Sequence, residues 1–189
     1  YVPCEIIYAA DAVPCGLCAS SEEPIPESES VLPRNLCPLI KASYGFALTD
    51  KCPYFYYSDL IVGETTCDGK KKMFELLNEI KETYVLKLPN SRDYPEALKE
   101  WRSEIIRFKE KLEDFYGITI TEDKIREAIR MKNKEREVMT EYLSLGKLYP
   151  AAISGYEMGS RTDAAGFSFD IEERCKTFAA RTEELKQYW

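Results

Sequence analysis

The first ninety residues alternate between short apolar runs and polar turns. The runs at 59–64 (DLIVGE) and 83–89 (TYVLKLP) have the length and composition of buried strands. Residues 67–81 between them place four apolar side chains on one face of a helix, namely Met73, Leu76, Leu77 and Ile80. A strand, a helix and a second strand in this order predict two parallel strands joined by a helical crossover.

The chain before this unit is less regular. Residues 3–10 predict a short helix with a proline near its start, and residues 12–19 predict a short buried strand. Residues 20–30 (SSEEPIPESES) are acidic and rich in proline and serine, which is typical of an exposed loop. Residues 35–48 predict a helix, with Asn35 as its N-cap.

The second half of the chain is charged and has helical periodicity. A capping pattern at Asp93 and Glu96 begins a helix that Gly117 ends, and Thr121 caps a second helix that runs to Gly146. The apolar positions of these helices are Leu98, Trp101, Ile105, Phe108, Leu112 and Phe115 in the first, and Ile125, Ile129, Met139 and Leu143 in the second. We expect the two helices to form an antiparallel hairpin, followed by a loop at 148–168 and a final helix at 169–189.

These elements predict an α/β fold with two domains. Residues 1–92 form an α/β lobe, and residues 93–189 contribute the hairpin, the loop and the final helix. A parallel sheet with so few strands is under-filled, since about five or six strands are usual. We therefore expect the chain to be a fragment whose second α/β lobe lies outside it.

Composition excludes several classes of function. The net charge is −7, which argues against a nucleic-acid-coating protein, and no apolar stretch approaches the roughly 18 residues of a membrane helix. The apolar opening carries Glu5 and Asp11 and lacks a basic leader, so it does not resemble a secretory signal, and we expect a cytoplasmic protein. The absence of histidine removes Ser–His and Cys–His catalysis together with histidine-ligated zinc and haem.

The chain contains seven cysteines, and six of them precede residue 68. Cys67 follows a predicted strand and opens a helix, where α/β proteins place ligands and where a helix N-terminus stabilises an anion. Cys37 occupies a comparable position. Two thiols at neighbouring strand–helix junctions are expected to face one cleft, although both residues would also serve as small buried hydrophobes.

The remaining cysteines are less specific. Cys15 and Cys18 form a C-x-x-C pair, which fits a redox dithiol or half of a metal site, and zinc is disfavoured because no second pair or histidine exists. Cys52 lies in a predicted loop and could reach the same cleft as Cys67. Cys4 and Cys175 lie in predicted helices, and we interpret them as packing residues.

Three lysines follow Cys67 within one helical turn. Lys70 and Lys71 are candidates to bind a cofactor, because they could counter the charge of a thiolate-bound cluster or of a phosphate-bearing ligand. The alternative is a solvated helix start, because three adjacent positions cannot all face one way.

Four sequence strings, VPCEIIYAADAVPCGLC, LPRNLCPLIKASYGF, KCPYFYYSDLIVGETTCDGKKKMFELL and AAISGYE, resemble the 2-hydroxyacyl-CoA dehydratase family. This family includes benzoyl-CoA reductase subunits and double-cubane cluster proteins, and the last branch is the better match. The resemblance implies flavodoxin-like (Rossmann-like) lobes with an iron–sulfur cluster between them, either 4Fe–4S or a double-cubane 8Fe–9S cluster. It implies Cys37 and Cys67 as ligands, and Cys18 and Cys52 as further ligands of a larger cluster.

The resemblance also implies an activity and partners. The leading interpretation is the N-terminal lobe of an oxygen-sensitive iron–sulfur reductase, which passes single low-potential electrons from an ATP-dependent iron–sulfur activase to a small molecule or an acyl-CoA. One alternative is a 2-hydroxyacyl-CoA dehydratase subunit, which eliminates water through a ketyl radical. Another is a non-catalytic partner subunit. Each of these implies assembly as a homodimer or as a heterodimer with a related subunit.

Overall fold

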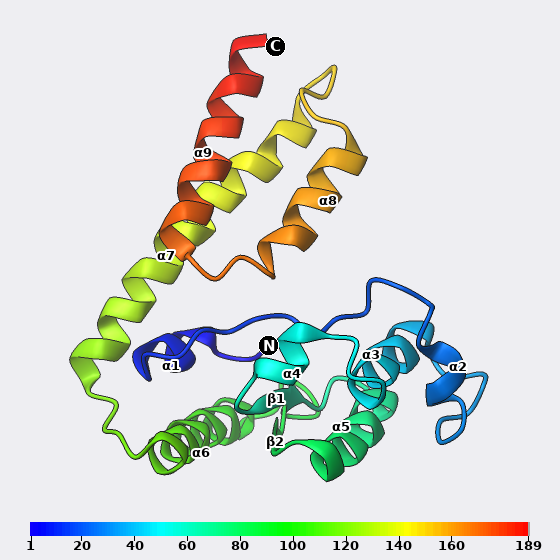
Figure 1. The fold of residues 1–189 in the computed structure, drawn as a ribbon. Helices are drawn as coiled ribbons and strands as arrows, with labels where there is room; N and C mark the ends of the chain where they lie inside the picture. The colour runs from blue at the N-terminus through cyan, green and yellow to red at the C-terminus, as the bar shows by residue number, and fades with distance from the viewer. Residues whose placement is uncertain (189) are drawn as a thin grey trace. The chain divides into compact units, whose positions relative to one another are not determined.

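The structure is a computed structural model and describes residues 1–188 (Figure 1). By its packing the chain divides into two compact units. The first unit contains residues 1–3 and 16–118, and the second contains residues 4–15 and 119–189. The predicted domain boundary between residues 92 and 93 stays a prediction. The chain passes from one compact unit to the other between residues 3 and 4, 15 and 16, and 118 and 119.

A small parallel sheet forms the centre of the first unit. β1 (Ile61–Glu64) pairs with β2 (Thr83–Leu86) in parallel, with Ile61 opposite Thr83 and Glu64 opposite Leu86. The helix α5 (Asp68–Ile80) connects the two strands, as the sequence predicts. A Cβ atom at Gly63 would lie 2.3 Å from the ring of Phe74, so glycine allows this ring of α5 to pack directly on the backbone of β1.

Four further helices complete the first unit: α2 (Ile25–Ser28), α3 (Pro38–Leu48), α4 (Pro53–Tyr57) and α6 (Ala97–Tyr116). α3 packs against α2 and α5, whereas α6 packs against β2. The buried core gathers side chains from α3, α4, β1, α5 and the loop before α3: Leu32, Ile40, Tyr44, Ala47, Cys52, Phe55, Ile61, Met73, Phe74 and Leu77. The unit is a mixed α/β structure that is mostly helical.

Two predictions before α3 are wrong. Residues 12–19 form no strand, and the predicted exposed loop at 20–30 contains the short helix α2 and the buried side chains of Pro24 and Ser28. A Cβ at Gly45 would lie 2.1 Å from the carbonyl oxygen of Pro24, so this glycine lets the loop approach α3. Composition marks the segment as polar but does not reveal this close contact.

The second unit is helical. It contains α1 (Cys4–Ala9), α7 (Glu122–Ser144), the 3₁₀ turn η1 (Leu145–Lys147), α8 (Gly155–Ala165) and α9 (Ile171–Tyr188). α7 packs against α1 and α9, around a core of Tyr142, Leu145, Ile153 and Phe178. The predicted loop at 148–168 is wrong because it contains α8, which Ser154 caps by accepting the N–H of Glu157 at 3.1 Å.

The long helices α6 and α7 form as predicted, but α6 begins at Ala97 with Glu96 as its N-cap, so the predicted cap at Asp93 is wrong. Part of the predicted apolar face is also wrong. Leu98 is 79% exposed, and Ile129 and Leu143 are each 41% exposed. The buried residues are instead Ala97, Glu104, Phe108 and Leu112 in α6, and Ala128, Glu135 and Tyr142 in α7. Burial of the two glutamates is possible because arginine and lysine side chains pair with them. The predicted hairpin of these helices stays a prediction. Within residues 1–188, no helix is both long and apolar enough to cross a membrane.

Candidate functional site

Three of the four predicted ligands occupy the same local position. Cys37, Cys52 and Cys67 are the N-cap residues of α3, α4 and α5. Asn35, the predicted cap of the helix at 35–48, lies two residues too early. The sulfur atoms of Cys52 and Cys67 each accept a backbone N–H of the first turn, which stabilises negative charge, whereas the side chain of Cys37 makes no cap hydrogen bond.

Cys67 follows β1 by three residues and is exposed. Its Sγ accepts a hydrogen bond from the backbone N–H of Lys70 at 3.4 Å. The helix α5 thus begins at the carboxyl end of a parallel strand, which is where α/β folds bind ligands. The predicted position of Cys67 is confirmed, although its role as a ligand stays a prediction.

Gly69 brings the turns of Cys37 and Cys67 into contact. A Cβ atom at Gly69 would lie 2.7 Å from Cδ1 of Ile40, 3.1 Å from Cδ1 of Leu36 and 4.0 Å from Sγ of Cys67. Leu36 and Ile40 flank Cys37 at the start of α3. The first turn of α5 therefore packs against the first turn of α3, and the two exposed cysteines belong to adjacent turns.

Cys52 and Cys18 differ from this pair. Cys52 is only 1% exposed and belongs to the apolar core of the first unit, where its Sγ accepts the N–H of Phe55 at 3.3 Å. Cys18 is half-buried and packs against the same core. Over the described part of the chain, no group of three or more cysteine and acidic side chains is arranged to hold a metal ion. Ligation by Cys18 and Cys52 stays a prediction.

The three lysines after Cys67 have separate partners. Lys70 Nζ lies 2.8 Å from Oε1 of Glu64, whereas Lys71 Nζ lies 3.1 Å from Oδ1 of the exposed Asp68. Lys72 pairs with Glu75 at the surface. Lys70 is therefore held against a buried carboxylate, and Lys71 keeps an ammonium at the surface. Their predicted contact with a cofactor is not tested by these positions.

Sequence reasoning missed two buried charged residues beside the cysteines. Glu64 is 7% exposed at the end of β1, and Lys41 is 7% exposed in α3. A signal for each existed, because Glu64 closes an apolar strand and Lys41 interrupts the apolar start of a helix. Charged residues in such surroundings are buried only when paired.

The other cysteines lie in the second unit. Burial is the largest influence on Cys4 and Cys175, and it raises the pKa of both thiols. A raised pKa keeps a thiol protonated and is typical of packing residues. Cys15 is exposed.

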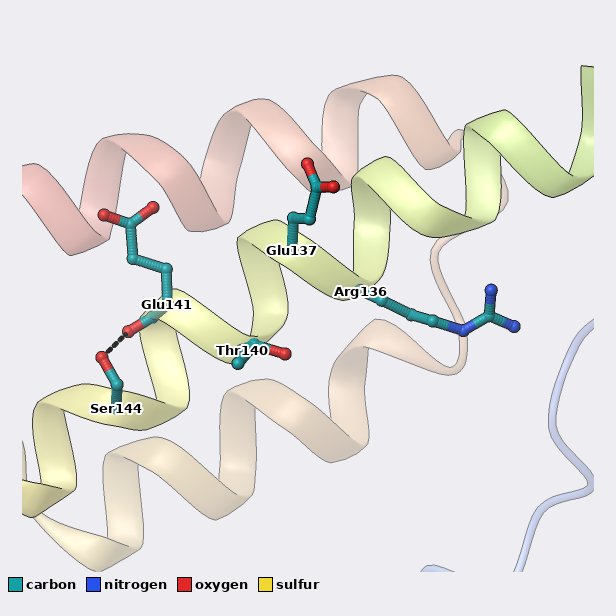
Figure 2. A pocket seen from close by; sticks show the side chains of 5 residues that line it. All are labelled: Arg136, Glu137, Thr140, Glu141 and Ser144. Carbon is teal, nitrogen blue, oxygen red and sulfur yellow. Dashed lines mark hydrogen bonds between the residues drawn. The ribbon is translucent and has the colours of Figure 1, made fainter.

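An open groove of about 460 Å³ lies along α7 in the second unit. Figure 2 shows its lining residues on successive turns of this helix, namely Arg136, Glu137, Thr140, Glu141 and Ser144. Arg136 pairs with Glu5, and Glu141 pairs with Lys186 at 2.5 Å. The groove contains no cysteine, and at least two of its charges are already paired within the unit.

The sequence matches, over residues 1–189, the family model described as the D-component of 2-hydroxyglutaryl-CoA dehydratase. The chain belongs to this family, which confirms the resemblance found in the sequence strings. The match covers the turns of Cys37 and Cys67 as well as the second unit. The closer likeness to the double-cubane branch stays a prediction.

Three relatives show the same relationship. The chain is 48% identical over 189 residues to "Putative dehydratase subunit YjiM" of Escherichia coli (strain K12), covering 100% of the chain and 49% of that protein. It is 28% identical over 158 residues to the (R)-phenyllactyl-CoA dehydratase beta subunit of Clostridium sporogenes, covering 82% of the chain and 41% of that protein. It is 24% identical over 155 residues to lactoyl-CoA dehydratase subunit beta of Anaerotignum propionicum, covering 81% of the chain and 40% of that protein. The chain spans less than half the length of these relatives.

Proposed function

We propose that the chain is the N-terminal part of a 2-hydroxyacyl-CoA dehydratase subunit and that Cys37 and Cys67 ligate an iron–sulfur cluster. The observation that carries the proposal is the contact made at Gly69, which places two exposed, helix-capping cysteines on adjacent turns. The relatives named as dehydratase subunits favour elimination of water from a hydroxyacyl thioester. They favour it over the broader interpretation of an electron-passing reductase.

The donor set fits such a group. Thiolates are the ligands that iron–sulfur clusters use, and hydrogen bonds to the sulfur atoms tune their reduction potentials. Cys67 receives such a bond from Lys70 N–H. When bound, a cluster supplies single electrons at low potential. Two cysteines cannot complete four-fold ligation, so we infer that further thiolates come from Cys18 and Cys52 or from protein outside this chain.

The chain's own residues also suggest how a substrate is held. The ammonium of Lys71 stands one helical turn from Cys67 and is paired only with an exposed aspartate, so a phosphate of an acyl-CoA could compete for it. The parallel β1–α5–β2 unit supports a flavodoxin-like lobe. Relatives named as beta subunits support assembly with a second, related subunit. An ATP-dependent iron–sulfur activase is the proposed electron donor.

Anaerobic reconstitution of the full-length protein with iron and sulfide tests the proposal. We expect a visible charge-transfer absorption band in the wild type and its loss in Cys37→Ser and Cys67→Ser. Cys15→Ser is the matched control, because Cys15 is exposed but lies in the other unit, and it should keep the band.

A wild-type protein that binds no iron or sulfide would refute cluster ligation. A cluster that persists in both Cys37→Ser and Cys67→Ser, with activity of the assembled complex unchanged, would instead support the alternative of a non-catalytic partner subunit. Loss of the band in either variant with normal folding would support direct ligation.

A further inference from the structure

Lys41 ties the segment before Cys37 to helix α3. Its side chain is 9% exposed, and Nζ donates to the carbonyl oxygen of Arg34 at 2.7 Å and to Oε1 of Glu29 at 2.8 Å. Removing an ammonium group from water is unfavourable unless its protons are paired. The two bonds provide that pairing and close the chain around Cys37, from Arg34 to Lys41.

Lys70 closes the chain around Cys67 in a similar way. Nζ donates to Oε1 of the buried Glu64 at 2.8 Å, and the backbone N–H of Lys70 donates to the sulfur of Cys67 at 3.4 Å. Thr66 Oγ1 donates to both oxygens of the same carboxylate, at 3.2 and 3.1 Å. One buried carboxylate thus holds the turn between β1 and α5 on both sides of Cys67.

The two arrangements share the position of the acceptor residue, although the acceptor is a backbone carbonyl for Lys41 and a side-chain carboxylate for Lys70. In each, a lysine in the opening turns of a helix reaches back past the N-cap cysteine, to the residue three positions before it, which is Arg34 in one case and Glu64 in the other. Lys71 stands four residues after Cys67, as Lys41 stands four after Cys37, yet it pairs with Asp68 on its own helix and makes no such contact. The repeated geometry therefore does not follow from helix formation alone.

We propose that Lys41 and Lys70 are positioning residues that hold the Cys37 and Cys67 turns in the conformation required for cluster ligation. This inference rests on the proposed function. Partners behind metal ligands fix the orientation of the ligands, and losing such a partner typically weakens metal binding by ~10–100-fold. Glu29 and Glu64 are the anchors of the two lysines.

The test uses the full-length protein, reconstituted anaerobically with iron and sulfide. Lys41→Met and Lys70→Met are compared with the wild type and with the control Lys72→Met. We expect each positioning variant to release iron to a chelator about tenfold faster or more, and the control to match the wild type. Lys70→Arg should restore most of the retention, because a guanidinium can also donate to Glu64.

A merely structural role would lower the unfolding temperature of the variant in proportion to its iron loss. The proposal instead expects a changed electron paramagnetic resonance signal of the reduced cluster, and faster iron release at temperatures where the variant is still fully folded. If Lys41→Met does not fold, Glu29→Gln weakens the same contact without removing the buried lysine. Release rates equal to the wild type in all three variants, Lys41→Met, Lys70→Met and Glu29→Gln, would overturn the proposal.

Failure of the two proposals is distinguishable. A wild type that takes up no cluster refutes the proposed function. Hydrogen exchange of the metal-free protein then still tests whether Lys41 and Lys70 hold the turns of Cys37 and Cys67. Amides in residues 34–37 and 64–70 should exchange faster in Lys41→Met and Lys70→Met respectively, and not in Lys72→Met. Unchanged exchange in both segments would show that the lysines do not hold the turns.

Discussion

The two units use buried charge for different purposes. In the first unit, Lys41 and Glu64 hold loops on either side of exposed cysteines. In the second unit, Arg174 and Glu135 form a buried ion pair between α9 and α7, at 2.5 Å, and the thiol next to it, that of Cys175, is buried. A buried charge therefore does not by itself mark a site. A buried charge indicates a functional site when it holds a reactive side chain, such as an exposed cysteine, at the surface.

The largest expected effect is a difference in thiol reactivity. In the metal-free protein, the exposed Cys37 and Cys67 should react quickly with iodoacetamide. The buried Cys52 and Cys175 should react at least about a thousandfold more slowly, because they need an opening that costs ~5 kcal/mol or more. Mass spectrometry of peptides after timed labelling measures the four rates. Cys52 labelling as fast as Cys67 would contradict its place in the core and strengthen its predicted role as a ligand.

A smaller effect is expected from breaking the buried ion pair of the second unit. Arg174→Ala leaves Glu135 without its buried partner and removes hydrogen bonds to the carbonyl oxygens of Ala165 and Ser168. Losing one member of a buried pair typically costs about 3–5 kcal/mol, and we expect the lower end because Lys132 still pairs with Glu135. Urea unfolding measures the change in free energy.

The control for Arg174→Ala is Arg126→Ala, which breaks an exposed ion pair with Glu122 on α7. Such pairs contribute less than about 1 kcal/mol, so the control should unfold close to the wild type. Equal effects of the two substitutions would show that burial of Arg174 does not matter. Iodoacetamide labelling of Cys37 and Cys67 in folded Arg174→Ala should stay fast, which separates stability in one unit from chemistry in the other.

The same contrast explains what the sequence could and could not predict. Neighbouring residues encode the β1–α5–β2 unit, the cap at Thr121 and the end of α6 at Gly117, and the structure confirms all three. The turns of Cys37 and Cys67 are adjacent, but not for the predicted reason. Residues 1–37 form no strand, so Cys37 does not lie at a strand–helix junction, and the two turns meet because α3 packs against α5 at Gly69. The contacts of Lys41 and Lys70 depend on which acceptor each ammonium group reaches in the folded chain. The periodicity of apolar residues contains no information about these acceptors.

Burial of charged residues also explains the wrong helix faces. A face calculated from apolar positions excludes Glu104 and Glu135, yet each is buried because a basic side chain pairs with it. The pairing of Glu135 joins residues 39 positions apart, which no local pattern reveals. The wrong prediction at 148–168 has another cause. The sequence of α8 contains glycines and polar residues, and the helix buries no side chain, so it has no apolar face that periodicity could reveal.

The smallest expected effect is a dependence of stability on pH through Glu135. Burial alone would raise the pKa of this carboxyl, but hydrogen bonds and charges from Lys132 and Arg174 outweigh it and leave the pKa lowered from 4.5. A carboxyl whose folded pKa is lowered stabilises the protein above the unfolded value, and this contribution disappears as pH falls through the folded pKa. Glu135→Gln should therefore be less stable than the wild type at neutral pH, and the gap should narrow as the pH falls below about 4.5. Urea unfolding of both proteins across this range measures the gap, and a gap that stays constant would show that Glu135 has the same pKa in the folded and unfolded chains.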